Sequence, residues 1–138
     1  MEHICIICYN DPTSHSCHIL DNPLNNSKII YTCPSRATKY DDTEGTIAHY
    51  KKVLELLGND DWEYMCDCTE FSLKHALCVK TAISIVKLIV EKYYKNLKKI
   101  SFVNSNNFIY ITLKIILPFL SDELKSKIYI DNIQYISE

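Results

Sequence analysis

Glycine and arginine are the two residue types that this chain nearly lacks. Its 138 residues include two glycines, Gly45 and Gly58, and one arginine, Arg36. A loop that cradles a phosphate needs several glycines close together, because only then can backbone N–H groups approach the anion. The sequence therefore excludes a Walker A loop and a Rossmann dinucleotide site, and it lacks the G-x-S-x-G turn of many serine hydrolases. With one arginine and a net charge of −2, it gives no basis for nucleic-acid binding.

The chain also shows no segment that reads as a secretion signal. No basic region precedes the short apolar run at residues 3–9, HICIICY. The seven cysteines are an odd number, so we expect free thiols in a reducing, cytoplasmic setting. Apolar residues make up 47% of the chain and charged residues 23%, which is typical of a globular protein. We expect one domain spanning residues 1–138.

Cysteine and histidine gather near the N-terminus, and zinc binding has to be weighed there. Cys5 and Cys8 have the spacing of a zinc knuckle. Ile6 and Ile7 between them favour a strand, which would send the two thiols to opposite faces. We therefore expect no metal, and elemental analysis for zinc would decide between the two readings. The full set is His3, Cys5, Cys8, His15, Cys17, His18 and Cys33.

A thiol nucleophile with a histidine base could be drawn from Cys66 or Cys68 with His75. Asp67 stands between the two cysteines, and a neighbouring carboxylate raises the pKa of a thiol rather than lowering it. We expect no catalysis.

Hydrophobic periodicity predicts alternating strands and helices. Strands are expected over residues 3–9, 28–33, 62–68, 99–104 and 127–131, and helices over 43–57, 72–94 and 107–117. Thr43 and Ser72 are the expected caps of the first two helices. Strands that alternate with helices of ten or more residues indicate an α/β fold with a mainly parallel β-sheet covered by helices.

The segment from Phe108 to Leu120 is the most unusual of these elements. Its apolar residues wrap more than one helical face, and Lys114 is its only charge. It is shorter than the ~20 apolar residues that span a bilayer, and it contains Pro118. We expect a buried or interfacial segment with something apolar against it. A simple core-packing helix is the alternative.

Four short patterns follow one another in a specific order: YY at 93–94, KISFVN at 99–104, LPFL at 117–120 and SKI at 126–128. This order resembles the second half of the CRAL-TRIO domain, the lipid-pocket fold of phosphatidylinositol-transfer and retinoid- or tocopherol-binding proteins. Residues 62–67 resemble the family's preceding strand. The resemblance covers residues 28–131 and leaves 1–27 as a divergent strand and loop. It implies a minimal form without the helical module that usually precedes the domain.

The resemblance implies a non-catalytic lipid-binding or lipid-transfer protein. One amphipathic lipid, a phospholipid or phosphoinositide, would lie in a hydrophobic pocket closed by an amphipathic gate helix over residues 107–117. No cofactor other than the bound lipid is implied, and transient contact with a membrane surface would accompany lipid exchange. The expected pocket and gate residues are Trp62, Tyr64, Phe102, Phe108, Ile111, Ile115 and Phe119.

Lys127 stands where members that bind inositol lipids carry a lysine for the head group, and Lys95 and Lys99 are expected helpers. Lys95 replaces the glutamate that those members place two residues after the family's tyrosine. Lysines near an anionic bilayer contribute about 1 kcal/mol each. The resemblance therefore implies lipid binding more firmly than it implies inositol specificity.

An alternative comes from a second similarity. Divergent CRAL-TRIO domains beside Rho GTPase-activating regions are similar at YYKNLKKI, residues 93–100, which implies a protein-interaction scaffold for small GTPases or their regulators. A cavity filled by Phe and Tyr side chains would favour this role. A homodimer would be one way to cover remaining apolar surface.

Overall fold

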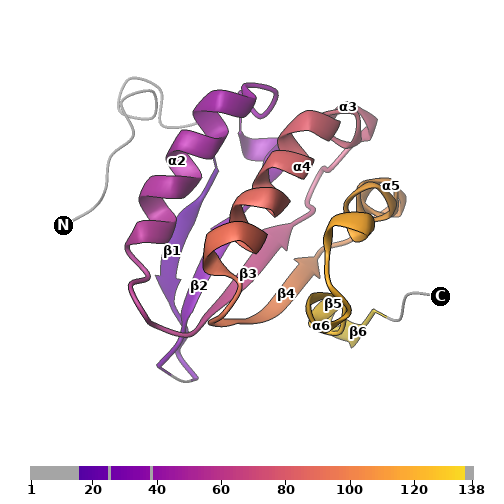
Figure 1. The fold of residues 1–138 in the computed structure, drawn as a ribbon. Helices are drawn as coiled ribbons and strands as arrows, with labels where there is room; N and C mark the ends of the chain where they lie inside the picture. The colour runs from indigo at the N-terminus through magenta and orange to yellow at the C-terminus, as the bar shows by residue number, and fades with distance from the viewer. Residues whose placement is uncertain (1–15, 25, 38, 136–138) are drawn as a thin grey trace.

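A computed structural model describes residues 16–24, 26–37 and 39–135. They form a six-stranded sheet in the order β1-β2-β3-β4-β5-β6 (Figure 1). The four central strands are parallel: β2 (Lys28–Thr32), β3 (Trp62–Asp67), β4 (Leu97–Val103) and β5 (Ile128–Ile130). Strands β1 (His18–Asp21) and β6 (Ile133–Gln134) pair antiparallel at the two edges. The expected α/β class with a mainly parallel sheet is confirmed.

Helices connect the parallel strands. They are α2 (Thr43–Glu55), α3 (Leu73–Ala76), α4 (Val79–Leu88), α5 (Asn107–Ile116) and α6 (Asp122–Lys125), with 3₁₀ turns η1 (Pro34–Arg36) and η3 (Leu117–Phe119) and a π turn η2 (Ile89–Tyr93). Each parallel strand lies beside the one before it, so right-handed crossovers bring their helices to the same face of the sheet. Figure 1 shows α2 and α4 across this face, with α5 and α6 near β4 and β5.

Alternation along the strands supplies the apolar layer beneath these helices. On β3, Trp62, Tyr64 and Cys66 are buried while Glu63 and Met65 are half-buried. Successive strand residues point to opposite faces, so the buried set meets the helices. The core is continuous from β2 to β5.

The first crossover helix begins at a different cap from the one the sequence predicts. The Asp42 side chain accepts a hydrogen bond from the Gly45 backbone N–H at 3.1 Å. The hydroxyl of Thr43, the expected cap, lies 2.8 Å from that of Thr81 on α4. The prediction of Thr43 as the cap was wrong because Thr43 pairs across the helix interface instead. Beyond α2, Gly58 adopts a left-handed φ of 56°, which a glycine accepts without strain.

The helix expected over 72–94 is divided into three pieces. Ser72 and His75 form a reciprocal capping box around the short helix α3. Leu77 and Cys78 then lie outside any helix, and the Cys78 thiol donates to the Lys74 carbonyl at 3.4 Å. Helix α4 follows and ends in the π turn η2. Periodicity alone did not reveal the break, because apolar residues continue through it.

The edge strands β1 and β6 were not predicted, since both are short and largely exposed. The expected strand at 3–9 lies outside the described residues. Within the described ranges, no helix combines the length and apolarity needed to span a bilayer.

Candidate functional site

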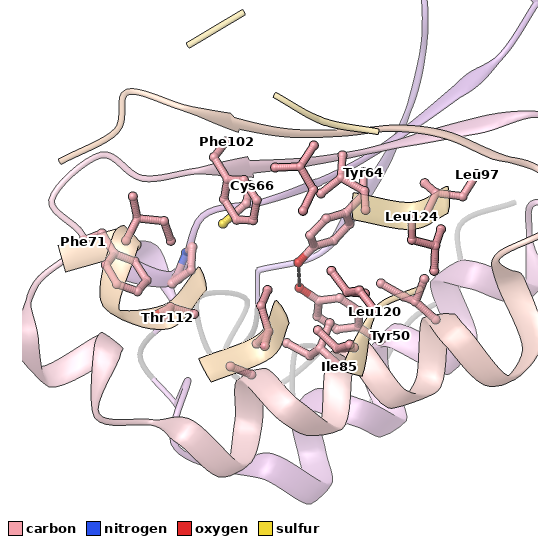
Figure 2. Close-up of a pocket in the computed structure, with 18 of the residues that line it drawn as sticks. Tyr50, Tyr64, Cys66, Phe71, Ile85, Leu97, Phe102, Thr112, Leu120 and Leu124 are labelled. Atoms are coloured by element: carbon pink, nitrogen blue, oxygen red, sulfur yellow. Dashed lines mark hydrogen bonds between the residues drawn. The ribbon is translucent and has the colours of Figure 1, made fainter. Parts of the chain in front are cut away.

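An apolar cavity lies between the sheet and the helices that cover it (Figure 2). Strands β3, β4 and β5 form its floor, and α4 and α5 form its roof. Its free volume is about 70 Å³, and none of the described residues that line it is charged. The lining residues are Pro34, Tyr40, Tyr50, Tyr64, Cys66, Phe71, Ala82, Ile85, Val86, Ile89, Leu97, Ile100, Phe102, Ile109, Thr112, Ile116, Leu120, Leu124 and Ile128.

The parallel register builds the floor. Tyr64 of β3 is the register partner of Ile100 on β4, and Cys66 is the partner of Phe102. Ile100 in turn faces Ile128 on β5. Since register partners on neighbouring strands point to the same face, these five side chains form one layer.

Two tyrosine hydroxyls meet inside the cavity. The hydroxyl oxygens of Tyr50 on α2 and Tyr64 on β3 lie 3.0 Å apart, and Figure 2 shows the two side chains pointing toward each other. Burial raises the pKa of both phenols well above the ordinary value. Both groups therefore stay protonated, so the cavity carries hydroxyl dipoles but no fixed charge.

Helix α5 forms the roof with one of its faces. Ile109, Thr112 and Ile116 recur at helical spacing and line the cavity. The opposite face leaves Phe108 and Ile111 about two-fifths exposed. The apolar residues that wrap this helix therefore form two surfaces, one toward the cavity and one toward solvent.

A comparison with protein-family models matches the CRAL/TRIO domain over residues 1–138. The chain belongs to the CRAL/TRIO domain family. The resemblance found in the sequence is confirmed, and the match also extends over residues 1–27. A search of the curated proteins found no match. Membership of the family supports a lipid-binding or small-ligand-binding role in general.

Two of the seven side chains expected to line a CRAL/TRIO pocket lie on the cavity wall, Tyr64 and Phe102. Phe108, Ile111 and Phe119 do not, because they lie on exposed surface, each about two-fifths accessible. Their part in a lipid pocket or in a gate stays a prediction.

Trp62 and Ile115 also lie off the cavity wall. Trp62 is fully buried, and its indole N–H donates to the Tyr93 carbonyl at 3.0 Å, so it anchors η2 to the start of β3. Ile115 is half-buried on the flank of α5. The sequence did not show which face of α5 turns inward, because apolar residues occupy both faces.

Most of the residues that line the cavity were not predicted, although the sequence pattern of two strands indicates some of them. Strand alternation from Tyr64 leads to Cys66, and alternation from Phe102 leads back to Ile100. Apolar periodicity places Tyr50 on the buried face of the first crossover helix, but no local pattern shows that it reaches the cavity.

The three lysines expected at a CRAL/TRIO head-group site lie outside the cavity wall. The Lys127 ammonium donates to the Leu97 carbonyl at 2.8 Å and lies 3.6 Å from a Glu123 carboxylate oxygen. Lys99 lies over the Tyr129 ring, 4.8 Å from its centroid, and Lys95 is exposed. Leu97 itself lines the cavity, so Lys127 lies next to one end of it.

A buried carboxylate closes β3 at the opposite end. Asp67 accepts hydrogen bonds from the Tyr31 hydroxyl at 2.5 Å, the Thr69 backbone and hydroxyl at 3.0 and 2.7 Å, and the Asn104 amide at 3.0 Å. Burial acts to raise its pKa, but these hydrogen bonds outweigh it and hold the pKa of Asp67 below the usual range. The carboxylate therefore ties together the ends of β2, β3 and β4.

No disulfide joins the described cysteines, and Cys17, Cys33, Cys66 and Cys68 are buried. A hydrogen bond with the Cys68 thiol, together with burial, raises the pKa of Cys66 well above the ordinary value. Among the described residues, no three His, Cys, Asp or Glu side chains gather closely enough to hold a metal ion. His3, Cys5, Cys8 and His15 lie outside the described residues.

Proposed function

We propose that this protein is a non-catalytic lipid carrier that holds one amphipathic lipid between the sheet and helix α5. The observation that carries the proposal is the cavity itself, which no charged side chain lines. Burying hydrocarbon against such a wall stabilises the complex by ~25 cal/mol per Å² of apolar surface removed from water.

The proposal requires the roof to move. Ligand pockets typically have volumes of about 300–1,000 Å³, whereas this cavity measures about 70 Å³. Helix α5 is the roof element that we propose opens, because its outward-facing side chains Phe108 and Ile111 are about two-fifths exposed and leave apolar surface in contact with solvent. These exposed side chains would meet the membrane during exchange. We propose a cytoplasmic protein that contacts membranes transiently and can pair with a second copy through such apolar surface.

The identity of the lipid is a separate question. A phospholipid or phosphoinositide would have to keep its phosphate outside the cavity, near Lys127, Lys99 or Lys95, since no cation lines the interior. Lys127 is already paired with Leu97 and Glu123. Its role as a head-group residue stays a prediction.

The states of two side chains, Cys66 and His75, support the proposal of a non-catalytic role. The raised pKa of Cys66 keeps its thiol protonated, and a thiol attacks as the thiolate. The imidazole Nδ1 of His75 accepts the Ser72 backbone N–H at 3.0 Å and is therefore engaged in the helix cap.

Lipid extraction tests the proposal. Protein purified from cells is extracted with organic solvent, the extract is analysed by mass spectrometry, and transfer of labelled phospholipid between vesicles is measured. We expect Ile116→Trp, which fills the cavity, to abolish lipid recovery and transfer. Ile111→Trp adds the same ring on the opposite face of α5 and should retain both. No recovered lipid and no transfer by the wild type would refute the carrier function.

The second candidate function, a scaffold for small GTPases, is favoured by the aromatic rings that occupy the cavity wall, Tyr40, Tyr50, Tyr64, Phe71 and Phe102. A pull-down with GDP- and GTP-loaded small GTPases tests it. A scaffold would bind in both the Ile116→Trp and the wild-type forms, because a filled cavity would not impair a surface contact.

A further inference from the structure

The roof of the cavity contains one hydroxyl group that forms no hydrogen bond with any described residue. Thr112 lines the cavity from α5 and is 8% exposed. Within the part of the chain that the structure describes, its Oγ1 is buried without any hydrogen bond, a condition that only the Thr46 hydroxyl shares among buried side-chain oxygens and nitrogens. Thr46 lies on α2 and does not line the cavity.

Leaving such a group unsatisfied is costly. A buried hydroxyl without a hydrogen bond destabilises the folded state by ~1–3 kcal/mol. A helical threonine usually avoids this by bonding the carbonyl one turn back, but Thr112 does not. A valine would fill the same space without the cost. An oxygen on a bound ligand would satisfy the hydroxyl.

The other residues of the cavity limit the chemical type of the ligand oxygen that could bind Thr112. No lining residue carries a charge, so a carboxylate or phosphate placed at Thr112 would lose its hydration without gaining a cation. The Tyr50 and Tyr64 hydroxyls already bond each other. Figure 2 places Thr112 beside Phe71, away from Leu97 and Leu124.

The size of the cavity limits the rest of the ligand. Phe71 follows the end of β3, whereas Leu97 begins β4, so these residues mark opposite ends of parallel strands. A ligand anchored at Thr112 would extend from there past the tyrosine pair. A cavity of about 70 Å³ has room for a narrow chain with far less roof movement than two acyl chains require.

We propose that the lipid held here is a neutral, single-chain lipophile whose hydroxyl or carbonyl oxygen forms a hydrogen bond with Thr112. This inference rests on the proposed lipid-carrier function and specifies its ligand class.

Displacement of the fluorescent probe N-phenyl-1-naphthylamine tests the inference with three ligands of equal chain length: decan-1-ol, decane and, at pH 8, decanoate. We expect wild-type protein to bind decan-1-ol most tightly. Thr112→Val should weaken the binding of decan-1-ol about five-fold, which is the effect of losing one neutral hydrogen bond. Its affinity for decane should be unchanged. Thr46→Val removes the other unpaired hydroxyl and should change the affinity for neither ligand. Circular dichroism checks that both variants fold.

Equal affinity of wild type and Thr112→Val for decan-1-ol would overturn the inference, as would decanoate binding as tightly as decan-1-ol. If decan-1-ol and decane bind equally well to the wild type, the carrier function survives and the role of Thr112 fails. If neither ligand displaces the probe and solvent extraction recovers no lipid, the carrier function and the inference fail together.

Discussion

The hydroxyl groups of Tyr50 and Tyr64 lie 3.0 Å apart inside a largely apolar cavity. Tyr50 comes from the first crossover helix and Tyr64 from the central strand β3, so one hydrogen bond joins two layers of the fold. Because both phenols are buried, each depends on a partner inside the protein.

This pair predicts a non-additive effect on stability. Tyr50→Phe leaves the Tyr64 hydroxyl without its partner, so we expect the free energy of unfolding to fall by ~1–2 kcal/mol. The double variant Tyr50→Phe/Tyr64→Phe should lose less than the sum of the single losses, with a coupling of ~1 kcal/mol. Urea denaturation followed by circular dichroism measures both. Tyr110→Phe, on the exposed face of α5, is the matched control and should change stability by under ~0.5 kcal/mol. Strict additivity would contradict the pairing.

Asp67 predicts a dependence of stability on pH. Its pKa in the folded protein lies below the unfolded value of about 3.9, so its contribution is complete above that value and is lost as pH falls toward the folded pKa. We expect Asp67→Asn to lower the free energy of unfolding by ~2 kcal/mol at pH 7, because charge-assisted hydrogen bonds from Tyr31 and Asn104 are weakened. The difference from wild type should shrink below about pH 4.

Denaturation at several pH values tests this, with the exposed Asp41→Asn as control. The same difference between wild type and Asp67→Asn at pH 3 and pH 7 would show that the carboxylate charge is not what stabilises the strand ends.

We expect Lys127 to stabilise the folded protein. Its ammonium joins the start of β5 to the start of β4 through the Leu97 carbonyl, so Lys127→Met should cost ~1 kcal/mol. Lys95→Met, at an exposed site, should cost nothing measurable. If the predicted head-group role is also correct, the ratio of phosphatidylinositol to phosphatidylcholine transfer should fall in Lys127→Met in vesicle assays. A ratio that matches wild type would leave Lys127 a role in stability alone.

The outer face of α5 predicts a defect in exchange at membranes. Phe108→Ser/Ile111→Ser removes two apolar side chains that are about two-fifths exposed, so we expect the free energy of unfolding to fall by ~1–3 kcal/mol while the protein stays folded by circular dichroism. Lipid transfer between vesicles should slow about five-fold, because burial of this surface in the bilayer is lost. Leu56 on the far end of α2 has the same exposure as Ile111, and Leu56→Ser is the control. Equal slowing by the control would remove any special role for α5.

The sequence predicted the strands and helices well and their interruptions poorly. The ranges 28–33, 62–68 and 127–131 overlap β2, β3 and β5, because period-two alternation is a local property. The break after α3 was missed because apolar residues continue through Leu77 and Cys78, so apolar periodicity does not register the end of one helix and the start of the next. Of the expected cavity side chains, Tyr64 and Phe102 were recoverable, since they stand on strands with one buried face.

The sequence by itself determined the α/β class, the resemblance to the CRAL/TRIO family and the exclusion of phosphate-binding loops, because periodicity, residue order and glycine content are properties of the chain alone. Only the tertiary structure decided which face of α5 turns inward, that Tyr50 meets Tyr64, and that Thr112 has no hydrogen-bond partner among the described residues. The physical reason is the same in each case. These relationships depend on how elements far apart in the chain are oriented against one another, and a pattern of neighbours along the chain does not encode that orientation.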